Sequence, residues 1–162
     1  MTQAQFLPYN SIRALAETIG ERHEIYQPGE PADLYRLVRD LGGQIAYSDD
    51  PEALHVERPD KFTINIPNMT SSRRDRFTIA HELGHYFLHY RLQGKTGAAI
   101  FGRGERNKVE TQANVFASAL LMPAETFKQA FTEFEGDVWA LARYFDVSPA
   151  SASVRAEVLQ LA

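Results

Sequence analysis

The motif His81-Glu82-Leu83-Gly84-His85 combines side chains that could bind a metal ion and activate water. Residues four apart on an α-helix lie about 40° apart around its axis and one turn apart along it, so His81 and His85 can point both imidazoles at one ion. Glu82 is rotated by about 100° from His81, which suits a carboxylate that reaches a water molecule rather than the ion. The spacing predicts a zinc site with Glu82 as the general base.

A catalytic zinc usually takes three protein ligands, so the chain must supply one more. His89 continues the same helix face, but it lies about 12 Å along the axis from His81 and cannot share an ion with both other histidines. We interpret His89 as a residue near the helix end that binds backbone or water.

Glu110 is the better candidate for the third ligand. It opens a second predicted helix, from Val109 to Met122, and shares one face with Ala113, Asn114 and Ala117. Small residues beside an acid let two helices approach closely, and Gly84 indicates the same on the first helix. We therefore predict Glu110 as the third ligand.

Two alternatives concern the acids, and one further prediction concerns Asn114. Glu110 could instead be a solvated acid that favours the dipole of its helix. Glu105 is the other acid between His85 and Glu110, but it lies in a glycine-rich loop and would be less preorganised. Asn114, one turn beyond Glu110, could accept a hydrogen bond from the ring N–H of a histidine ligand.

The segments Arg76-Phe77-Thr78-Ile79-Ala80-His81-Glu82-Leu83-Gly84-His85 and Glu110-x-x-Ala113-Asn114-x-Phe116-Ala117-x-x-Leu120-Leu121-Met122-Pro123 resemble the ImmA/IrrE family of zinc metallopeptidases. The resemblance covers most of the chain and implies a gluzincin-like endopeptidase. Its Zn²⁺ would be bound by His81, His85 and Glu110, and Glu82 would be the base. Family members cleave helix-turn-helix repressors in phage, mobile-element, toxin–antitoxin and stress-response circuits, so the implied partner is such a repressor or antitoxin.

Two other functions remain open beside the peptidase. The chain could keep zinc as a scaffold and act by sequestering a repressor or antitoxin, or as the toxin of such a pair, in which case Glu82 would be dispensable. It could also be a DNA-binding regulator that uses its C-terminal helices. The oxyanion donor is open as well, between Tyr86, His89, Tyr90 and the loop arginines.

We predict an α+β fold, zincin-like and mostly helical, with a small mixed or antiparallel sheet of about three strands beside the active-site helix. A single domain, 1–162, would comprise a zincin-like core, 1–123, and a C-terminal helical subdomain, 124–162. The expected helices are 11–22, 33–41, 73–89, 109–122, 124–131, 137–144 and 149–161, and the expected strands are 44–47, 54–57 and 62–66. Asn10 or Ser11 would cap the first helix, and Asn68, Thr70 or Ser71 the active-site helix.

Several elements flank the predicted site. The strand 62–66 could be the sheet edge at which an extended substrate adds itself as a strand, or it could be internal. Segment 92–108 carries four glycines, with Lys95, Arg103 and Arg106 among them, and it could be a flap over the cleft or a solvated loop. Arg73, Arg74 and Arg76 oppose the dipole of the active-site helix, so they could pair with acids, face an acidic substrate segment or form a solvated face.

The C-terminal residues 141–151 resemble a helix-turn-helix, with Ser148 as N-cap and Pro149 at the first helical position. The second helix opens without the Arg, Lys, Asn or Gln that would meet base edges, so direct DNA binding is not expected. Packing or docking of a protein partner would account for the shape. Trp139 is expected in the core.

Composition sets the remaining limits. Of 162 residues, 44% are hydrophobic, and the formal net charge of −4 argues against binding to nucleic acid by bulk electrostatics. The chain has no cysteine, which excludes disulfides and thiolate ligands and fits a reducing compartment. It has no leader-like start and no run of ~20 apolar residues, so we expect a cytoplasmic protein without a membrane segment.

Overall fold

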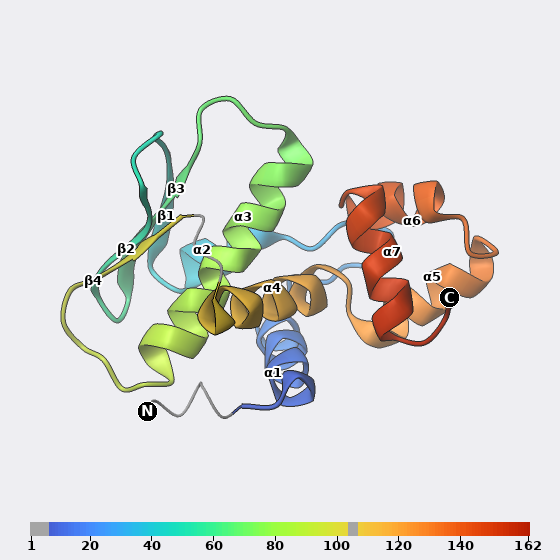
Figure 1. Ribbon diagram of the computed structural model, residues 1–162, viewed down its shortest axis with the longest axis horizontal. Helices are drawn as coiled ribbons and strands as arrows, with labels where there is room; N and C mark the ends of the chain where they lie inside the picture. The colour runs from blue at the N-terminus through green and yellow to red at the C-terminus, as the bar shows by residue number, and fades with distance from the viewer. Residues whose placement is uncertain (1–6, 104–106) are drawn as a thin grey trace.

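A small β-sheet packs on one side of helix α3, and helices α4 and α1 lie on its other side (Figure 1). The computed structural model describes residues 7–103 and 107–162. Three further helices, α5 to α7, gather at the end of the molecule opposite the sheet. The fold is therefore α+β, as expected, with the predicted metal-binding helix in the middle. Within the described ranges, no helix is long and apolar enough to cross a membrane.

The sheet has four strands in the order β1-β3-β2-β4. Strands β1 and β3 are parallel, whereas β2 is antiparallel to both β3 and β4. Burial alternates along β3, because Phe62, Ile64 and Ile66 face the core and the residues between them do not. The strands are Gly43–Tyr47 (β1), Glu52–Arg58 (β2), Lys61–Ile66 (β3) and Ala99–Gly102 (β4).

Two expectations about the sheet change. The sequence pattern predicts about three strands, but the sheet has four. The fourth strand, β4, forms inside segment 92–108, where the sequence pattern predicts only a loop. Strand β3 is internal, as the second alternative had it, and β4 is the edge strand beside the site. Residues 104–106 of that segment, including the alternative ligand Glu105, lie outside the described residues.

The helices before the C-terminal group agree with the sequence pattern to within a few residues. Asp33 caps α2 by accepting from the backbone N–H of Arg36, and Ser71 caps α3 by accepting from that of Arg74. Helix α1 follows Pro8 without a side-chain cap, so the expected cap at Asn10 or Ser11 is wrong. These elements are Tyr9–Arg22 (α1), Leu34–Asp40 (α2), Ser72–His85 (α3), the π-helical turn Tyr86–Arg91 (η2) and Lys108–Leu121 (α4).

Helices α3 and α4 pack closely against each other at Gly84. A Cβ atom placed on Gly84 would lie 3.1 Å from both the Cα and the carbonyl oxygen of Ala113, and 3.2 Å from Cβ of Phe116. The contact brings the first turn of α4 over the histidines of α3. The close helix approach expected from Gly84 and Ala113 is therefore present.

We expect Gly84→Ala to destabilise the fold by about 1 kcal/mol, which is the mid-range cost of overpacking less the gain in helix propensity. Alanine favours a helix over glycine by about 1 kcal/mol, but overpacking against the Ala113 backbone costs about 1–3 kcal/mol. Urea unfolding of the metal-free protein measures the difference. Gly97→Ala is the control, because nothing lies within 4 Å of the added Cβ there. A Gly84→Ala protein as stable as wild type would mean that the two helices can separate at no cost.

The C-terminal helices are Ala124–Glu133 (α5), Val138–Phe145 (α6) and Pro149–Val158 (α7), and α7 ends three residues before the predicted Leu161. The turn between α6 and α7 has the predicted cap, since Ser148 accepts from the backbone N–H of Ser151. Arg155 is buried, and its Nε donates to the carbonyl of Met122, 2.9 Å away. The boundary drawn at residue 123 stays a prediction.

Trp139 lies on the surface, so its predicted core position is wrong. Its side chain is 66% exposed, whereas Leu141, Ala142 and Phe145 of the same helix are buried. At about 100° per residue, Trp139 lies about 160° around the helix axis from Leu141. The apolar stripe of α6 therefore faces the core without it.

Candidate metal centre

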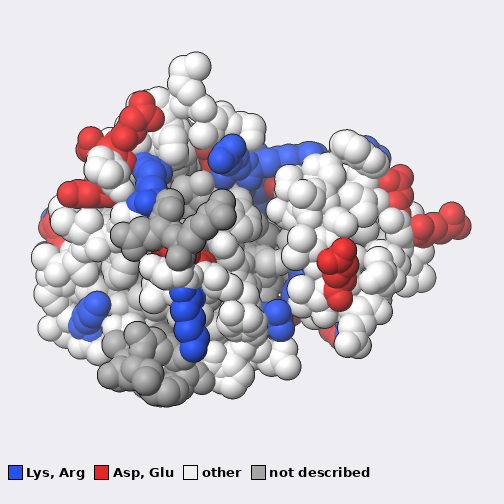
Figure 2. All heavy atoms as spheres, in the orientation of Figure 1, with Lys and Arg blue, Asp and Glu red and all other residues white. Residues whose placement is uncertain are grey.

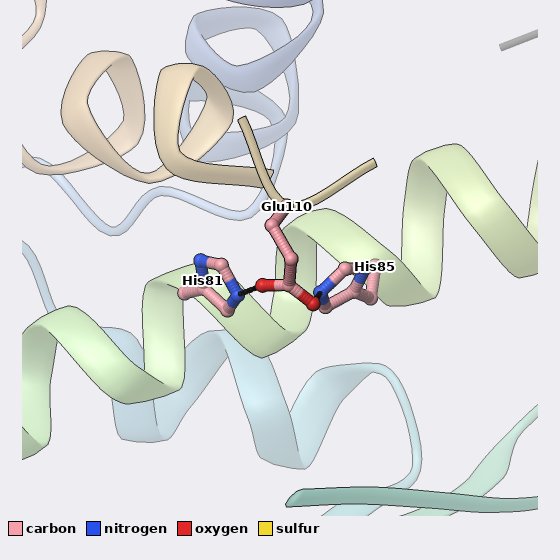
Figure 3. A group of neighbouring side chains, drawn as sticks. All are labelled: His81, His85 and Glu110. Atoms are coloured by element: carbon pink, nitrogen blue, oxygen red, sulfur yellow. Dashed lines mark hydrogen bonds and ion pairs between the residues drawn. The ribbon is translucent and has the colours of Figure 1, made fainter. Parts of the chain in front are cut away.

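Helices α3 and α4 bring His81, His85 and Glu110 together, with one ligand atom from each within 4.8 Å of the others. Nε2 of His81 lies 2.6 Å from Oε2 of Glu110, and Nε2 of His85 lies 3.0 Å from its Oε1 (Figure 3). Asn107 caps α4 by accepting from the backbone N–H of Glu110, which fixes the first turn of the helix. Two imidazoles and one carboxylate can together bind a divalent cation.

The far side of each histidine ring is held by a hydrogen bond. Nδ1–H of His81 donates to Oδ1 of Asn114, 2.7 Å away. Nδ1–H of His85 donates to Nδ1 of His89 over 2.8 Å. With both Nδ1 atoms used as donors, Nε2 of each ring presents its lone pair toward Glu110. Asn114 thus lies within hydrogen-bond distance of His81, and its role toward a bound metal ion stays a prediction.

His89 takes part in a buried chain of hydrogen bonds, so the expectation that it binds backbone or water is wrong. Its Nε2–H donates to Oε1 of Gln112, 2.8 Å away, which leaves its Nδ1 as the acceptor for His85. His89 and Gln112 are 3% and 0% exposed. The i, i+4 spacing could have indicated the contact between His85 and His89. The contact with Gln112 could not be read from spacing, because Gln112 lies on the facing helix α4.

We expect His89→Leu to weaken metal binding about tenfold to hundredfold, the usual cost of removing a partner that orients a ligand. Leucine keeps the bulk of the side chain but offers no acceptor to Nδ1–H of His85. Competition with a chromophoric chelator measures the affinity. His23→Leu is the control, because His23 pairs with Asp40 away from the site. An unchanged affinity in His89→Leu would show that the tautomer of His85 needs no such partner.

Glu82 follows His81 on α3 and is buried beside the cluster. Its side chain is 3% exposed, and its Oε1 has no hydrogen-bond partner among the described residues. Burial raises the pKa of Glu82 to about 8, and the nearby Glu110 adds to the rise. A buried carboxylate oxygen without a partner is costly, so this atom fits a site where a water molecule and a cation complete its surroundings.

His85 is suited to be a ligand because it stays neutral. Burial lowers its pKa to about 3, with smaller contributions from His81 and His89. A histidine ligand must be deprotonated at the coordinating nitrogen, so the ring needs no proton release near pH 7.

We expect Glu82→Gln to stabilise the metal-free fold at pH 8.5 by about 2–4 kcal/mol, and by much less at pH 5. The folded pKa of Glu82 lies above its unfolded value of 4.5, so stability is complete below pH 4.5 and is lost as pH rises toward 8. The glutamine side chain of the variant does not ionise and escapes this loss. Urea unfolding of both metal-free proteins across this range is the measurement. Parallel pH curves would contradict the burial of an ionisable Glu82.

A cavity of about 360 Å³ opens over the centre. Strand β4 forms one side of it, because Gly102 and Arg103 line the cavity and the Phe101 ring stacks on His85 with centroids 5.4 Å apart. Arg103 is held by the carbonyls of Asp50 and Ser48, at 2.9 and 3.0 Å. The sequence pattern did not single out Phe101 as a site residue, although the run Ala99-Ile100-Phe101 could have indicated a short strand. Arg103 is one of the loop arginines considered as oxyanion donors.

The chain is similar to known proteins over most of its length. Residues 44–157 match the IrrE N-terminal-like domain. The chain is 29% identical over 139 residues to Metallopeptidase ImmA of Bacillus subtilis (strain 168), an alignment that covers 85% of this chain and 77% of ImmA. It is 38% identical over 152 residues to the Radiation response metalloprotease IrrE of Deinococcus deserti, covering 90% of this chain. The chain spans 54% of that IrrE.

The matched domain extends over most of the chain and includes the whole His–His–Glu cluster together with Glu82. Both relatives carry metal-dependent peptidase names, and the cluster has the donors of a metal centre. The chain therefore belongs to the ImmA/IrrE family of metallopeptidases.

Proposed function

We propose that the chain is a zinc-dependent endopeptidase of the gluzincin type. The observation that carries the proposal is the buried Glu82 carboxylate, with an oxygen unpartnered among the described residues, next to the cluster of His81, His85 and Glu110. Those three side chains would hold Zn²⁺. When bound there, zinc supplies a Lewis acid that polarises the scissile carbonyl and lowers the pKa of water.

Glu82 carries the protons in this reaction. Its carboxylate accepts a proton from the water whose oxygen attacks the scissile carbonyl carbon, and it later delivers that proton to the amine nitrogen as the C–N bond breaks. Burial suits this role, because the same desolvation that raises its pKa makes the carboxylate a stronger base.

The candidates for the oxyanion donor become fewer. Tyr90 donates its hydroxyl hydrogen to the carbonyl of Gly97, 2.8 Å away, and His89 is engaged with His85 and Gln112. Tyr86 is buried against the Phe62 ring, with centroids 4.3 Å apart. Of these candidates, Arg103 is the described side chain that lines the cavity over the centre, so we infer that it is the donor.

The substrate we propose is a helix-turn-helix repressor or antitoxin in a phage, mobile-element, toxin–antitoxin or stress-response circuit. Family resemblance supports this choice, and the name of the relative IrrE refers to a radiation response. The edge strand β4 supports an extended substrate, because a peptide could pair with its outer side next to His85. The cytoplasmic setting expected from the sequence stays a prediction.

The alternative is a zinc-containing module that binds and sequesters the repressor or antitoxin, or acts as the toxin component of such a pair, without cleavage. Trp139 on α6, whose side chain is 66% exposed, offers apolar surface for a docked protein there. Direct DNA binding is not proposed, because α7 opens with Pro149, Ala150 and Ser151 at the positions that would meet bases.

Co-expression tests the two functions against each other. A helix-turn-helix repressor from the same genome, taken from the neighbouring gene where that gene encodes one, is produced with wild type or with Glu82→Gln under zinc-replete conditions, and its intact mass is measured. We expect one peptide bond cut by the wild type and none cut by Glu82→Gln. An uncut repressor that co-purifies with both forms would establish sequestration instead.

A further inference from the structure

A groove leads away from the metal centre toward helix α7. Three adjoining cavities form it, of about 360, 420 and 270 Å³, and Phe77 lines all of them. The first contains His81 and Glu82, the second lies between the start of α3 and the start of α7, and the third lies between α4 and α7. Volumes of this size suit side chains of a bound ligand. We call the second and third cavities the α7 groove.

The walls of the α7 groove combine an apolar surface with positive charge. Phe77, Ala150 and Val154 line the 270 Å³ cavity between α4 and α7, and no charged residue of the described chain lines this cavity. The side chain of Val154 is 55% exposed. The charged side chains of the second cavity are Arg73 and Arg74. Figure 2 shows Lys and Arg side chains gathered where the start of α3 faces the C-terminal helices.

The two arginines differ in their partners. Nε of Arg73 lies 3.4 Å from Oδ1 of Asp146, whose other oxygen lies 3.5 Å from Nε of Arg76. These ion pairs connect the α6–α7 turn, whose Val147 lines the groove, to the first turns of α3. Arg74 is exposed and forms no ion pair with any carboxylate in the described residues, yet it lines both the first and the second cavity.

We propose that the α7 groove binds an extended substrate segment on one side of the scissile bond, with a large apolar side chain against Phe77 and Val154 and an acidic side chain against Arg74. The inference rests on the proposed peptidase function and names the class of peptide that the site takes. A peptide occupies the groove because the groove runs directly into the cavity with Glu82, and the guanidinium of Arg74 complements a single carboxylate.

Nucleic acid is a poorer occupant of the same surface. A backbone with one phosphate per nucleotide calls for several cations in a row, whereas the groove offers Arg74 beside an apolar wall. The centre at its end is lined by Glu82 and Glu110, which would repel phosphate. The charge pattern therefore selects a peptide with an isolated acid.

The test profiles a synthetic dodecapeptide library with randomised positions. Zinc-loaded wild type, Arg74→Glu and Val154→Asp are compared by the sequences they cleave, with Arg143→Glu and Val158→Asp as controls on the same C-terminal helices outside the groove. We expect wild type to prefer Asp or Glu at one site and a large apolar residue at a neighbouring one. Arg74→Glu should reverse the charge preference about tenfold in kcat/KM, and Val154→Asp should lose the apolar preference about tenfold or more.

A binding arm separates the two hypotheses. The same library is captured on zinc-loaded Glu82→Gln with and without Arg74→Glu. One outcome is that the wild type cleaves no peptide while Glu82→Gln still captures peptides with an acidic and an apolar residue in an Arg74-dependent way. In that case the peptidase function fails and the groove assignment stands. If the wild type cleaves and all profiles match, the groove assignment is overturned while the peptidase stands. The absence of both cleavage and Arg74-dependent capture overturns both.

Discussion

Glu82→Gln should lower kcat for peptide cleavage by about 10²–10⁴-fold, the usual contribution of a positioned general base, while zinc stays bound. Glutamine has the same shape and fills the same buried space, but it cannot accept a proton from water. The loss should appear in kcat and in kcat/KM equally, because the proton transfer occurs only in the transition state. The measurement is single-turnover cleavage of a peptide that spans the bond cut in the repressor.

Two controls make this prediction specific to the carboxylate. Zinc content by native mass spectrometry must be equal in wild type and Glu82→Gln, since Glu82 is not one of the three proposed ligands. Glu125→Gln, which changes an exposed acid on α5, should cleave like wild type. Cleavage by zinc-loaded Glu82→Gln at the wild-type rate would remove Glu82 from the reaction.

Glu110→Ala should weaken zinc binding by more than the tenfold to hundredfold that an orienting partner contributes, and cleavage should vanish with it. Alanine removes the carboxylate that lies 2.6 Å from His81 and 3.0 Å from His85, so two histidines are left to hold the ion. Two ligands leave the coordination shell incomplete and exposed to water. Chelator competition gives the affinity, and added zinc should restore only part of the activity.

The matched control for this variant is Glu52→Ala, which changes an acid on strand β2 that lies outside the cluster. Circular dichroism should show the same helix content in all three proteins, because α4 keeps its cap at Asn107. A Glu110→Ala protein that binds zinc as tightly as wild type would mean that another side chain is the third ligand.

Much of the site is accessible from spacing alone. The i, i+4 separation of His81 and His85 fixes their relative direction on any α-helix, whatever the rest of the fold does. Gly84 and Ala113 indicate that two helices approach closely, and in the structure the helices meet at these two residues. Glu110 and Asn114 then follow, because residues four apart on the second helix meet the same face of the first.

Other features depend on contacts that no local pattern contains. His89 is i+4 from His85, so its position is readable, but its use as an acceptor depends on Gln112 from the facing helix. Strand β4 is a short segment of four residues, and its partner β2 lies more than 40 residues earlier in the chain. The prediction for Trp139 is wrong because it takes Trp139 to lie on an apolar helix face. The helix period places Trp139 about 160° around the axis from the buried Leu141.

The sequence by itself determined the spacing of the candidate site residues, with His81, Glu82 and His85 on one predicted helix and Glu110 and Asn114 on another. Those relations are short-range and follow from backbone geometry. Tertiary structure alone decided the surroundings, namely the edge strand over His85, the burial that raises the pKa of Glu82, and the groove that runs past Arg74 to α7. Burial, strand order and cavities arise only when segments distant in the chain pack together, so no window of sequence contains them.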